Sequence, residues 1–281
     1  MPAIYTHLRF GEEVAKTLPE PYVSVIHKYI EAFRLGTQGP DILFYHQPLK
    51  ANEIRKYGTY LHTFSGNRFF ALQAKLFNEQ TGRNLEDSLK NNGAFSAYLC
   101  GFLCHFTLDA ICHPYIDEHS TEAVSHGKIE SELDKYLLRK DGLPIRGYNT
   151  ATPILDENGT AEACAKALGV SKEEITLSIK TIRKINGWFS SKCEPFHGIA
   201  HLFLKMVGME RKFGDMFLHK KDDPLCAEPN EELYTRWQNS VPVAGKIIEE
   251  FFNNIDTLAN DGVLKNELFR YDFSGIIKEE T

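Results

Sequence analysis

The stretch AYLCGFLCHFTLDAICHP, from Ala97 to Pro114, constrains the fold of this chain more than any other. It is apolar almost throughout, yet it carries His105, Asp109 and His113 at intervals of four residues, a series we call the ligand ladder. A helix advances about 100° per residue, so this spacing returns each side chain to nearly the same face. The segment therefore predicts a buried helix, which Pro114 is expected to end. Isolated buried charge is costly, so the ladder is expected to meet partners or a metal ion.

Further candidate ligands are concentrated in the first 130 residues. They are His7 near the start, Asp41 in a Gly-Pro turn, His62 in an aromatic-rich segment, and the pair His126 and Glu130, which are again four residues apart. Imidazole nitrogen and carboxylate oxygen without thiolate suit zinc, and also iron or manganese. Eight ligands exceed what one tetrahedral ion needs, so they indicate a site for two or three ions that share carboxylates.

The remaining chain also shows helical spacing of apolar residues, which predicts an all-α fold, a compact multi-helix bundle around a buried metal cluster. Helices are expected at about 4–18 (with a bend near Gly11), 22–35, 57–77, 95–112, 126–138, 161–168, 172–189, 195–213 and 231–259. Ser171 and Glu174 have the spacing of a capping box. Loops are expected at 115–125 and 215–230, the least helical stretch at 141–159, and a frayed end at 273–281.

The length of 281 residues fits one large domain or two small ones. Residues 1–140 hold all eight ligands and are expected to form the metal-binding helical core. Residues 141–281 carry no recognisable motif. They are expected to be a helical continuation packed on that core within the same single domain.

Charge, cysteines and the first residues narrow the class of protein. The net charge is −6, and no basic stretch dominates the chain. Stable binding to a nucleic acid or to an anionic membrane is therefore not expected. No segment approaches the roughly 18 apolar residues of a membrane span, and the start of the chain lacks the pattern of a signal peptide. The six cysteines show no CxxC pair and are expected to be reduced and mostly buried. A cytoplasmic protein is therefore expected, with an exported protein that has lost its signal as the alternative.

Other residues suggest weaker hypotheses. His197 and His201 have metal-pair spacing but no obvious carboxylate beyond Glu194, so we interpret them as a satisfied helical pair. Cys100 and Cys104 are expected to point away from the ladder, while Cys112 flanks it. Four further histidines are expected to be surface or structural residues: His27, His46, His119 and His219. Three acidic residues after the ladder are expected to be a solvated charge run, with substrate contact as the alternative: Asp117, Glu118 and Glu122.

The order and spacing of the eight ligands resemble the bacterial zinc-dependent phospholipase C family, which is related in core architecture to fungal single-strand nucleases with three zinc ions. The pattern consists of Thr6-His7, Gly39-Pro40-Asp41, His62, His105-x3-Asp109-x3-His113-Pro114 and His126-x3-Glu130. It covers residues 1–140. The resemblance implies an all-α fold, a clustered zinc site and hydrolysis of phosphoester or phosphodiester bonds by activated water.

The resemblance also implies a role for each ligand. One ion would be held by Asp41, His62, His105 and Asp109, a second by His113, His126 and Glu130, and a third by His7 with Asp109 bridging it to the first. The family's third ion is also bound by the amino terminus of a mature chain that begins with Trp, whereas this sequence begins Met-Pro-Ala. Asp41 is also offered as a possible general base.

Two functions from different classes follow. The first is a phospholipase C-like metal-dependent hydrolase that acts on a small phosphoester or a lipid headgroup. The alternative is a non-catalytic helical protein with a structural metal cluster. A structural site is closed by four protein ligands, while a catalytic site keeps a position open. The three-ligand set of His113, His126 and Glu130 therefore favours the enzyme.

Overall fold

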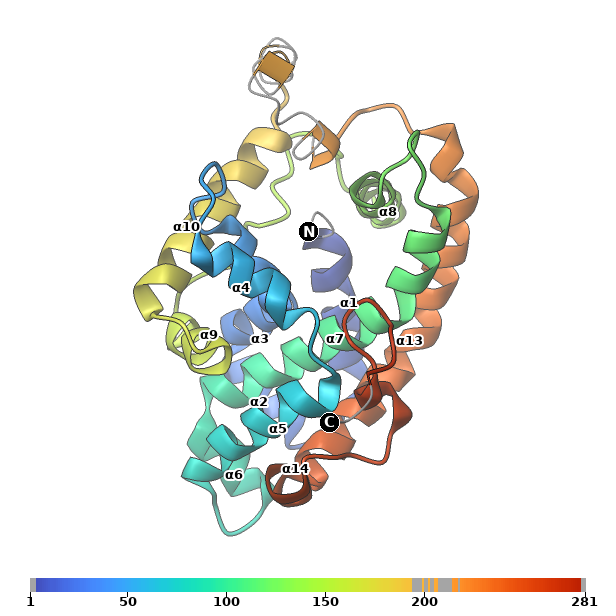
Figure 1. The fold of residues 1–281 in the computed structure, drawn as a ribbon. Coiled ribbons are helices and arrows are strands. Elements are labelled where there is room, and N and C mark those ends of the chain that lie inside the picture. Colours follow the sequence, from blue (N-terminus) through green and yellow to red (C-terminus); the bar gives the residue numbers. More distant parts are fainter. Residues whose placement is uncertain are drawn as a thin grey trace.

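The computed structural model describes residues 4–193, 199, 202, 205–206, 214–216 and 218–278 (Figure 1). Its α-helices are α1 (Ile4–Thr17), α2 (Tyr22–Lys28), α3 (Ile30–Gly36), α4 (Glu53–Leu61), α5 (Gly66–Phe77), α6 (Leu85–Asn92), α7 (Ala94–His119), α8 (His126–Lys140), α9 (Thr160–Leu168), α10 (Lys172–Phe189), α13 (Ala227–Asn253) and α14 (Ile255–Asp261). Short 3₁₀ turns are η1 (Gly39–Tyr45), η2 (Asn78–Gln80), η3 (Gly214–Met216), η4 (Pro224–Cys226) and η5 (Glu267–Arg270). These ranges contain no strand, so the all-α prediction is confirmed.

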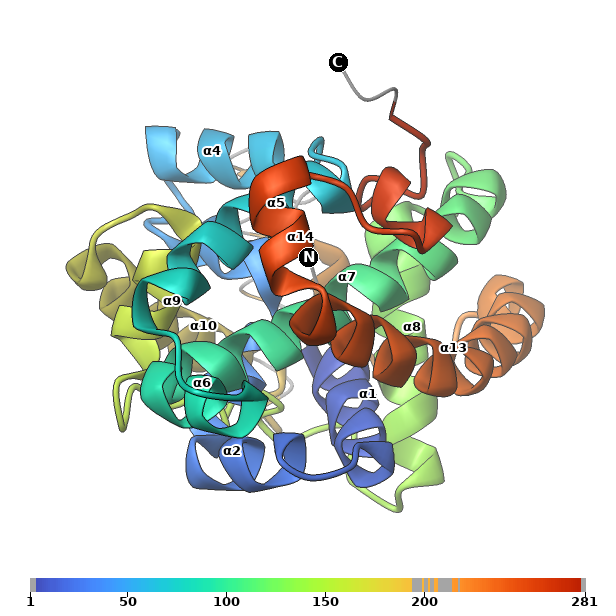
Figure 2. The ribbon, with the colours of Figure 1, turned by 90° about the horizontal axis from the view of Figure 1, so that it is seen from below.

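Helix α7 is the axis of the fold, and α1, α3, α9 and α13 pack around it (Figures 1 and 2). Every residue from Phe95 to Ala110 is buried, so this helix has no solvent face along most of its length. Among the described helices, α7 is long enough and apolar enough to cross a membrane, although the sequence predicts no membrane-spanning segment. Since 94% of its apolar 18-residue segment is buried inside the protein, we interpret α7 as the core helix of the fold.

Helices α3 and α7 cross at two glycines. A Cβ on Gly101 would lie 2.1 Å from the carbonyl oxygen of Phe33, and a Cβ on Gly36 would lie 2.2 Å from that of Tyr98. The two backbones therefore touch, which requires residues without a side chain. This contact brings the end of α3, and the carbonyl group of Thr37, against the buried part of α7.

Several helix boundaries differ from the sequence predictions. Residues 57–77 form two helices, because the side chain of Ser65 caps the start of α5 and His62 lies at the end of α4. Residues 22–35 are likewise divided at Tyr29, and residues 231–259 at Asn254. The helix over the first residues is continuous through Gly11. The polar residues 85–92 form α6, and α13 begins inside the expected loop 215–230.

Pro114 does not end the central helix as predicted, because α7 continues to His119. Proline cannot donate to the carbonyl oxygen four residues before it, here that of Ala110. The added turn buries Ile116, and the backbone at Gly275 packs so closely that a Cβ there would lie 2.6 Å from the Ala110 oxygen. Tertiary packing therefore outweighs the lost hydrogen bond.

Other expectations for the chain are confirmed. Residues 141–159 contain no helix, and Ser171 and Glu174 form the capping box at the start of α10. All six cysteines are free, and five are buried, including Cys100 and Cys104. Most of the expected helix 195–213, with His197, His201 and Glu194, lies outside the described residues. The division at residue 140 stays a prediction.

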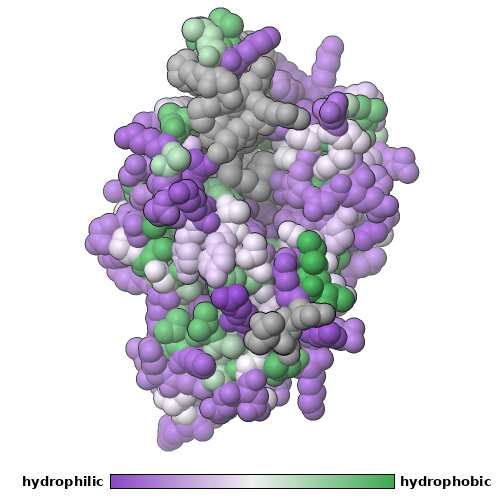
Figure 3. Space-filling model, viewed as in Figure 1, coloured by the Kyte–Doolittle hydropathy of each residue, from purple (hydrophilic) through white to green (hydrophobic). Residues whose placement is uncertain are grey.

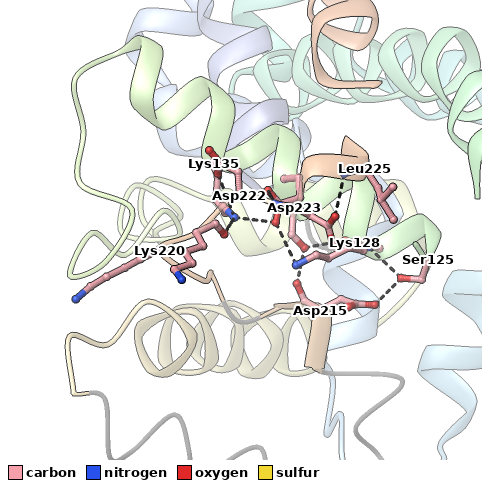
Figure 4. A network of polar contacts seen from close by, with 12 residues as sticks. Ser125, Lys128, Lys135, Asp215, Lys220, Asp222, Asp223 and Leu225 are labelled. Atoms are coloured by element: carbon pink, nitrogen blue, oxygen red, sulfur yellow. Dashed lines mark hydrogen bonds and ion pairs between the residues drawn. The ribbon is translucent and has the colours of Figure 1, made fainter. Parts of the chain in front are cut away.

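A polar network ties the loop before α13 to α8 (Figure 4). The ammonium group of Lys135 is buried and donates to Glu132 at 2.7 Å and to the carbonyl oxygen of Lys221 at 2.8 Å. Glu132 also lies 3.1 Å from Lys128. Buried charges are tolerated when they are paired and hydrogen-bonded in this way. The network therefore fixes α8, the helix that carries His126 and Glu130.

The glycine crossing yields a stability prediction. Gly101→Ala should lower the free energy of unfolding by about 1–3 kcal/mol, because the added methyl group meets backbone that cannot repack. Chemical denaturation measures this change. Gly245→Ala is the matched control, since the nearest atom to its Cβ would be 3.6 Å away, and it should be neutral or stabilising by about 0.5–1 kcal/mol. Equal effects of the two variants would contradict the inference that backbone contact at Gly101 requires a residue without a side chain.

Candidate metal centre

The structure brings the eight predicted ligands into three adjoining groups. In each group the ligand atoms lie within 4.8 Å of one another: His7, His105 and Asp109; Asp41, His62 and His105; and His113, His126 and Glu130. His105 belongs to two of the groups. We call the eight residues together the metal centre. Which ion each residue holds, and whether Asp41 also acts as a base, stay predictions.

Asp109 lies in the middle of the centre and faces three histidines. Its Oδ2 atom lies 3.1 Å from Nε2 of His105, and its Oδ1 atom lies 3.3 Å from Nε2 of His7 and 3.5 Å from Nε2 of His113. The side chain is 4% exposed. Its two oxygens therefore point at ligands of different groups, as a bridging carboxylate requires.

The outer groups repeat this pairing of imidazole and carboxylate. Nε2 of His62 lies 3.0 Å from Oδ1 of Asp41. Oε1 of Glu130 lies 3.4 Å from Nε2 of His126 and 3.6 Å from Nε2 of His113. Every imidazole of the centre thus turns its Nε2 atom toward a carboxylate oxygen.

The opposite nitrogen of four rings is held by a hydrogen-bond acceptor. Nδ1 of His62 donates to the carbonyl oxygen of Gly58 at 2.7 Å, that of His105 to Thr37 at 3.2 Å, that of His113 to Phe273 at 2.7 Å, and that of His126 to the Asp117 carboxylate at 2.7 Å. Such acceptors require a proton on Nδ1, so in the neutral ring the lone pair is on Nε2. Metal-binding histidines are oriented in this way.

A buried atom without a partner tests whether these residues fit zinc. Nε2 of His105 is buried and makes no hydrogen bond, although a carboxylate oxygen of Asp109 is 3.1 Å away. Two lone pairs at that distance repel each other unless a proton or a cation lies between them. Buried groups of this kind are normally satisfied. The nitrogen and oxygen donors, their burial and their orientation therefore fit zinc.

The electrostatics of the centre point the same way. Burial would raise the pKa of Asp109, but the His105 and His113 imidazoles hold it well below its usual range. Burial would lower the pKa of His113, but the carboxylates of Asp109 and Glu130 raise it to about 9. The pKa of Glu130 is also held low against its burial, with contributions from the His113 and His126 imidazoles. The centre therefore favours added positive charge, whether as protons or as metal ions.

Two local features place the ligands that lie outside α7. Gly39 has a φ of +51°, and a Cβ there would lie 2.2 Å from the His105 ring, so only glycine lets η1 bring Asp41 beside His105. At the other side, Asp134 of α8 accepts from the backbone N–H of Thr6 at 2.8 Å and from its hydroxyl group at 2.6 Å. This contact anchors the first turn of α1, which carries His7.

Sequence reasoning missed the residues that support the ligands, among them Asp117, Asp134 and Phe273. Asp117 was interpreted as part of a solvated charge run, but it follows His113 by four residues and so continues the ladder spacing. Asp134 follows Glu130 by the same interval. Both could have been found from that spacing. Phe273 supports the centre through its backbone carbonyl group, and no sequence pattern reveals that contact.

The other singled-out residues lie apart from the three ligand groups. His119 stacks on Tyr115, with ring centroids 3.9 Å apart, and His27 is exposed. His46 is buried and His219 is half-buried. Burial raises the pKa of the Cys112 thiol to about 12, so this cysteine is a neutral core residue.

Fold and site together define an all-α protein with a buried imidazole–carboxylate centre suited to zinc. A family model described as zinc-dependent phospholipase C matches residues 6–194, a span that contains all eight ligands. The chain therefore belongs to the zinc-dependent phospholipase C family, as the resemblance implied, and the match extends beyond residue 140. No curated protein and no solved structure matches the chain.

The Asp117 contact yields a prediction about zinc affinity. Asp117→Ala should weaken zinc binding at the group containing His126 by about 10–100-fold, because the ring loses the hydrogen-bond acceptor that orients it. Competition with a fluorescent chelator measures this affinity. Glu118→Ala, one residue further along, removes the same charge from an exposed position and should leave zinc affinity unchanged. If both variants bind zinc like the wild type, Asp117 does not orient His126.

Proposed function

We propose that this protein hydrolyses the phosphodiester bond between the headgroup and the diacylglycerol of a phospholipid, with two or three zinc ions at the metal centre. The family is that of a zinc-dependent phospholipase C, which supports a metal-dependent hydrolase acting on phospholipids. The number of ions, the bond cleaved and the substrate are the parts that the proposal adds.

The observation that carries the proposal is that some ligands of the centre are fully buried while others are partly exposed. The side chains of His105 and Asp109 are 0% and 4% exposed, whereas those of Asp41, His62 and His126 are 15%, 18% and 36% exposed. A structural zinc site encloses its ion with protein ligands. An edge of partly exposed ligands leaves room for a substrate phosphate, which favours an enzyme over the structural alternative.

Zinc bound at these groups would supply Lewis-acid stabilisation of the phosphoryl oxygens and would lower the pKa of a water molecule toward neutrality. The protein's own residues provide a prearranged frame. Five imidazoles are aimed at the centre, and four of them are held from behind by hydrogen bonds. Groups fixed in this way need no reorganisation when charge develops during the reaction. Asp41 is the most exposed of the three carboxylates of the centre, at 15% against 4% for Asp109 and 5% for Glu130.

The surface near the partly exposed ligands favours a phospholipid over a small soluble phosphoester as the substrate. Ile276 and Ile277 are 57% and 51% exposed, only a few residues after Phe273, which contacts the centre. The corresponding region in Figure 3 is a hydrophobic patch over the C-terminal loop. An exposed apolar patch is suited to a lipid surface. A cytoplasmic location is also part of the proposal, because free thiols are typical of reducing compartments.

A product assay tests the proposal. The purified protein should release a phosphorylated headgroup and diacylglycerol from phosphatidylcholine vesicles. A chelator should abolish this release, and added zinc should restore it. Chromatography of both products distinguishes the cleaved bond, because cleavage at the acyl ester would give fatty acid instead. A zinc-loaded protein that releases neither a phosphorylated headgroup from lipid nor alcohol from a soluble phosphodiester would support the structural alternative.

Asp109→Asn tests the central carboxylate. Because Asp109 faces ligands of different groups, the variant should lose more than one zinc ion per chain. Its kcat/KM should fall more than it would on changing a residue that only orients a ligand, for which about 10–100-fold is expected. Elemental analysis and the product assay measure the two effects. Asp261→Asn, an exposed change at the end of α14, is the control. Full zinc content in Asp109→Asn would refute the bridging role.

A further inference from the structure

The C-terminal hairpin, residues Tyr271–Lys278, lies outside the span that matches the family, yet it contacts the metal centre. The backbone N–H of Phe273 donates to the carbonyl oxygen of His62 at 3.4 Å, and the carbonyl oxygen of Phe273 accepts from Nδ1 of His113 at 2.7 Å. His62 and His113 belong to different ligand groups. Phe273 therefore forms hydrogen bonds with residues of two different ligand groups.

The side chain of Phe273 reinforces this link. It is fully buried, and its ring centroid lies 5.3 Å from that of His62 and 5.9 Å from that of His105. On its other side it packs against Phe106 at 5.2 Å. The ring is therefore an apolar wall of the centre, and the aromatic core holds it in place.

The hairpin itself is firmly folded, although residues 273–281 were expected to fray. Oδ1 of Asp272 accepts from the backbone N–H groups of Ser274 at 2.9 Å and Ile276 at 3.0 Å, and Oδ2 lies 2.8 Å from Nζ of Lys278. Gly275 has a φ of +70°, and a Cβ there would lie 2.3 Å from Cγ of Pro114. These contacts fix the hairpin against α7. The expectation of fraying was wrong for residues 273–278.

We propose that Phe273 is a positioning residue that sets the distance and ring orientation between the His62 group and the His113 group, and that the hairpin is the device that holds it. The protein thus uses a segment beyond the family's matched region to complete its metal centre. This inference rests on zinc occupying the centre, as in the proposed function. Its test therefore measures zinc binding rather than hydrolysis.

The experiment compares three variants of the full chain. Asp272→Ala removes the acceptor for both backbone N–H groups and should free the hairpin. Asp272→Asn retains an Oδ1 acceptor and should rescue the wild-type behaviour. Ile277→Ser changes an exposed side chain of the same hairpin and is the matched control. Zinc affinity per folded chain is measured by chelator competition, and the visible spectrum of the cobalt-substituted protein reports ligand geometry.

We expect Asp272→Ala to lose about 10–100-fold in zinc affinity for the group containing His113 and to show an altered cobalt spectrum. Asp272→Asn and Ile277→Ser should resemble the wild type. A merely structural hairpin would lower thermal stability and leave affinity and spectrum unchanged, which would overturn the inference. If circular dichroism shows that Asp272→Ala does not fold, Gly275→Ala displaces the hairpin by a clash with Pro114 and is judged by the same criteria. A wild-type chain that binds no zinc would instead refute the proposed function.

Discussion

The close contact of α3 with α7 is the constraint on which the metal centre depends. Because Gly36 and Gly101 let the two backbones touch, the residue after α3, Thr37, reaches the ring of His105 with its carbonyl group. The chain then passes the same ring at Gly39, where a side chain could not fit, and delivers Asp41 to the edge of the centre. A side chain at any of these glycines would move ligands as well as helices.

Local spacing explains what the sequence could predict. The ladder on α7 and the pair on α8 follow from helix geometry, which needs no knowledge of the rest of the fold. The ends of elements were less predictable. Pro114 signals a helix end locally, yet packing of Ile116 and of the chain at Gly275 keeps the helix intact. His62 lies at the end of α4 because Ser65 starts a new helix three residues later. Contacts between distant segments decide these cases.

The supporting contacts of the centre differ in how they can be altered. Asp117 and Asp134 act through side chains, so a single substitution removes them. Gly58, Thr37 and Phe273 act through backbone carbonyl groups, so no polar side chain at those positions marks the contact. Three of these five supporting residues are therefore invisible in sequence patterns of polar residues. Their contacts depend instead on where the backbone runs, and hence on the glycines and aromatic residues that guide it.

The contact between His113 and Phe273 joins residues 160 positions apart. During synthesis, which proceeds from the N-terminus, α7 emerges long before the segment that orients its third ligand. The ligands of α1 and α7 can come together early, but the His113 ring gains its hydrogen bond to Phe273 only when residues 271–278 have docked. Completion of the metal centre is thus expected to depend on synthesis of the hairpin. A chain truncated before the hairpin would keep all eight ligands but lose the hydrogen bond that holds the His113 ring.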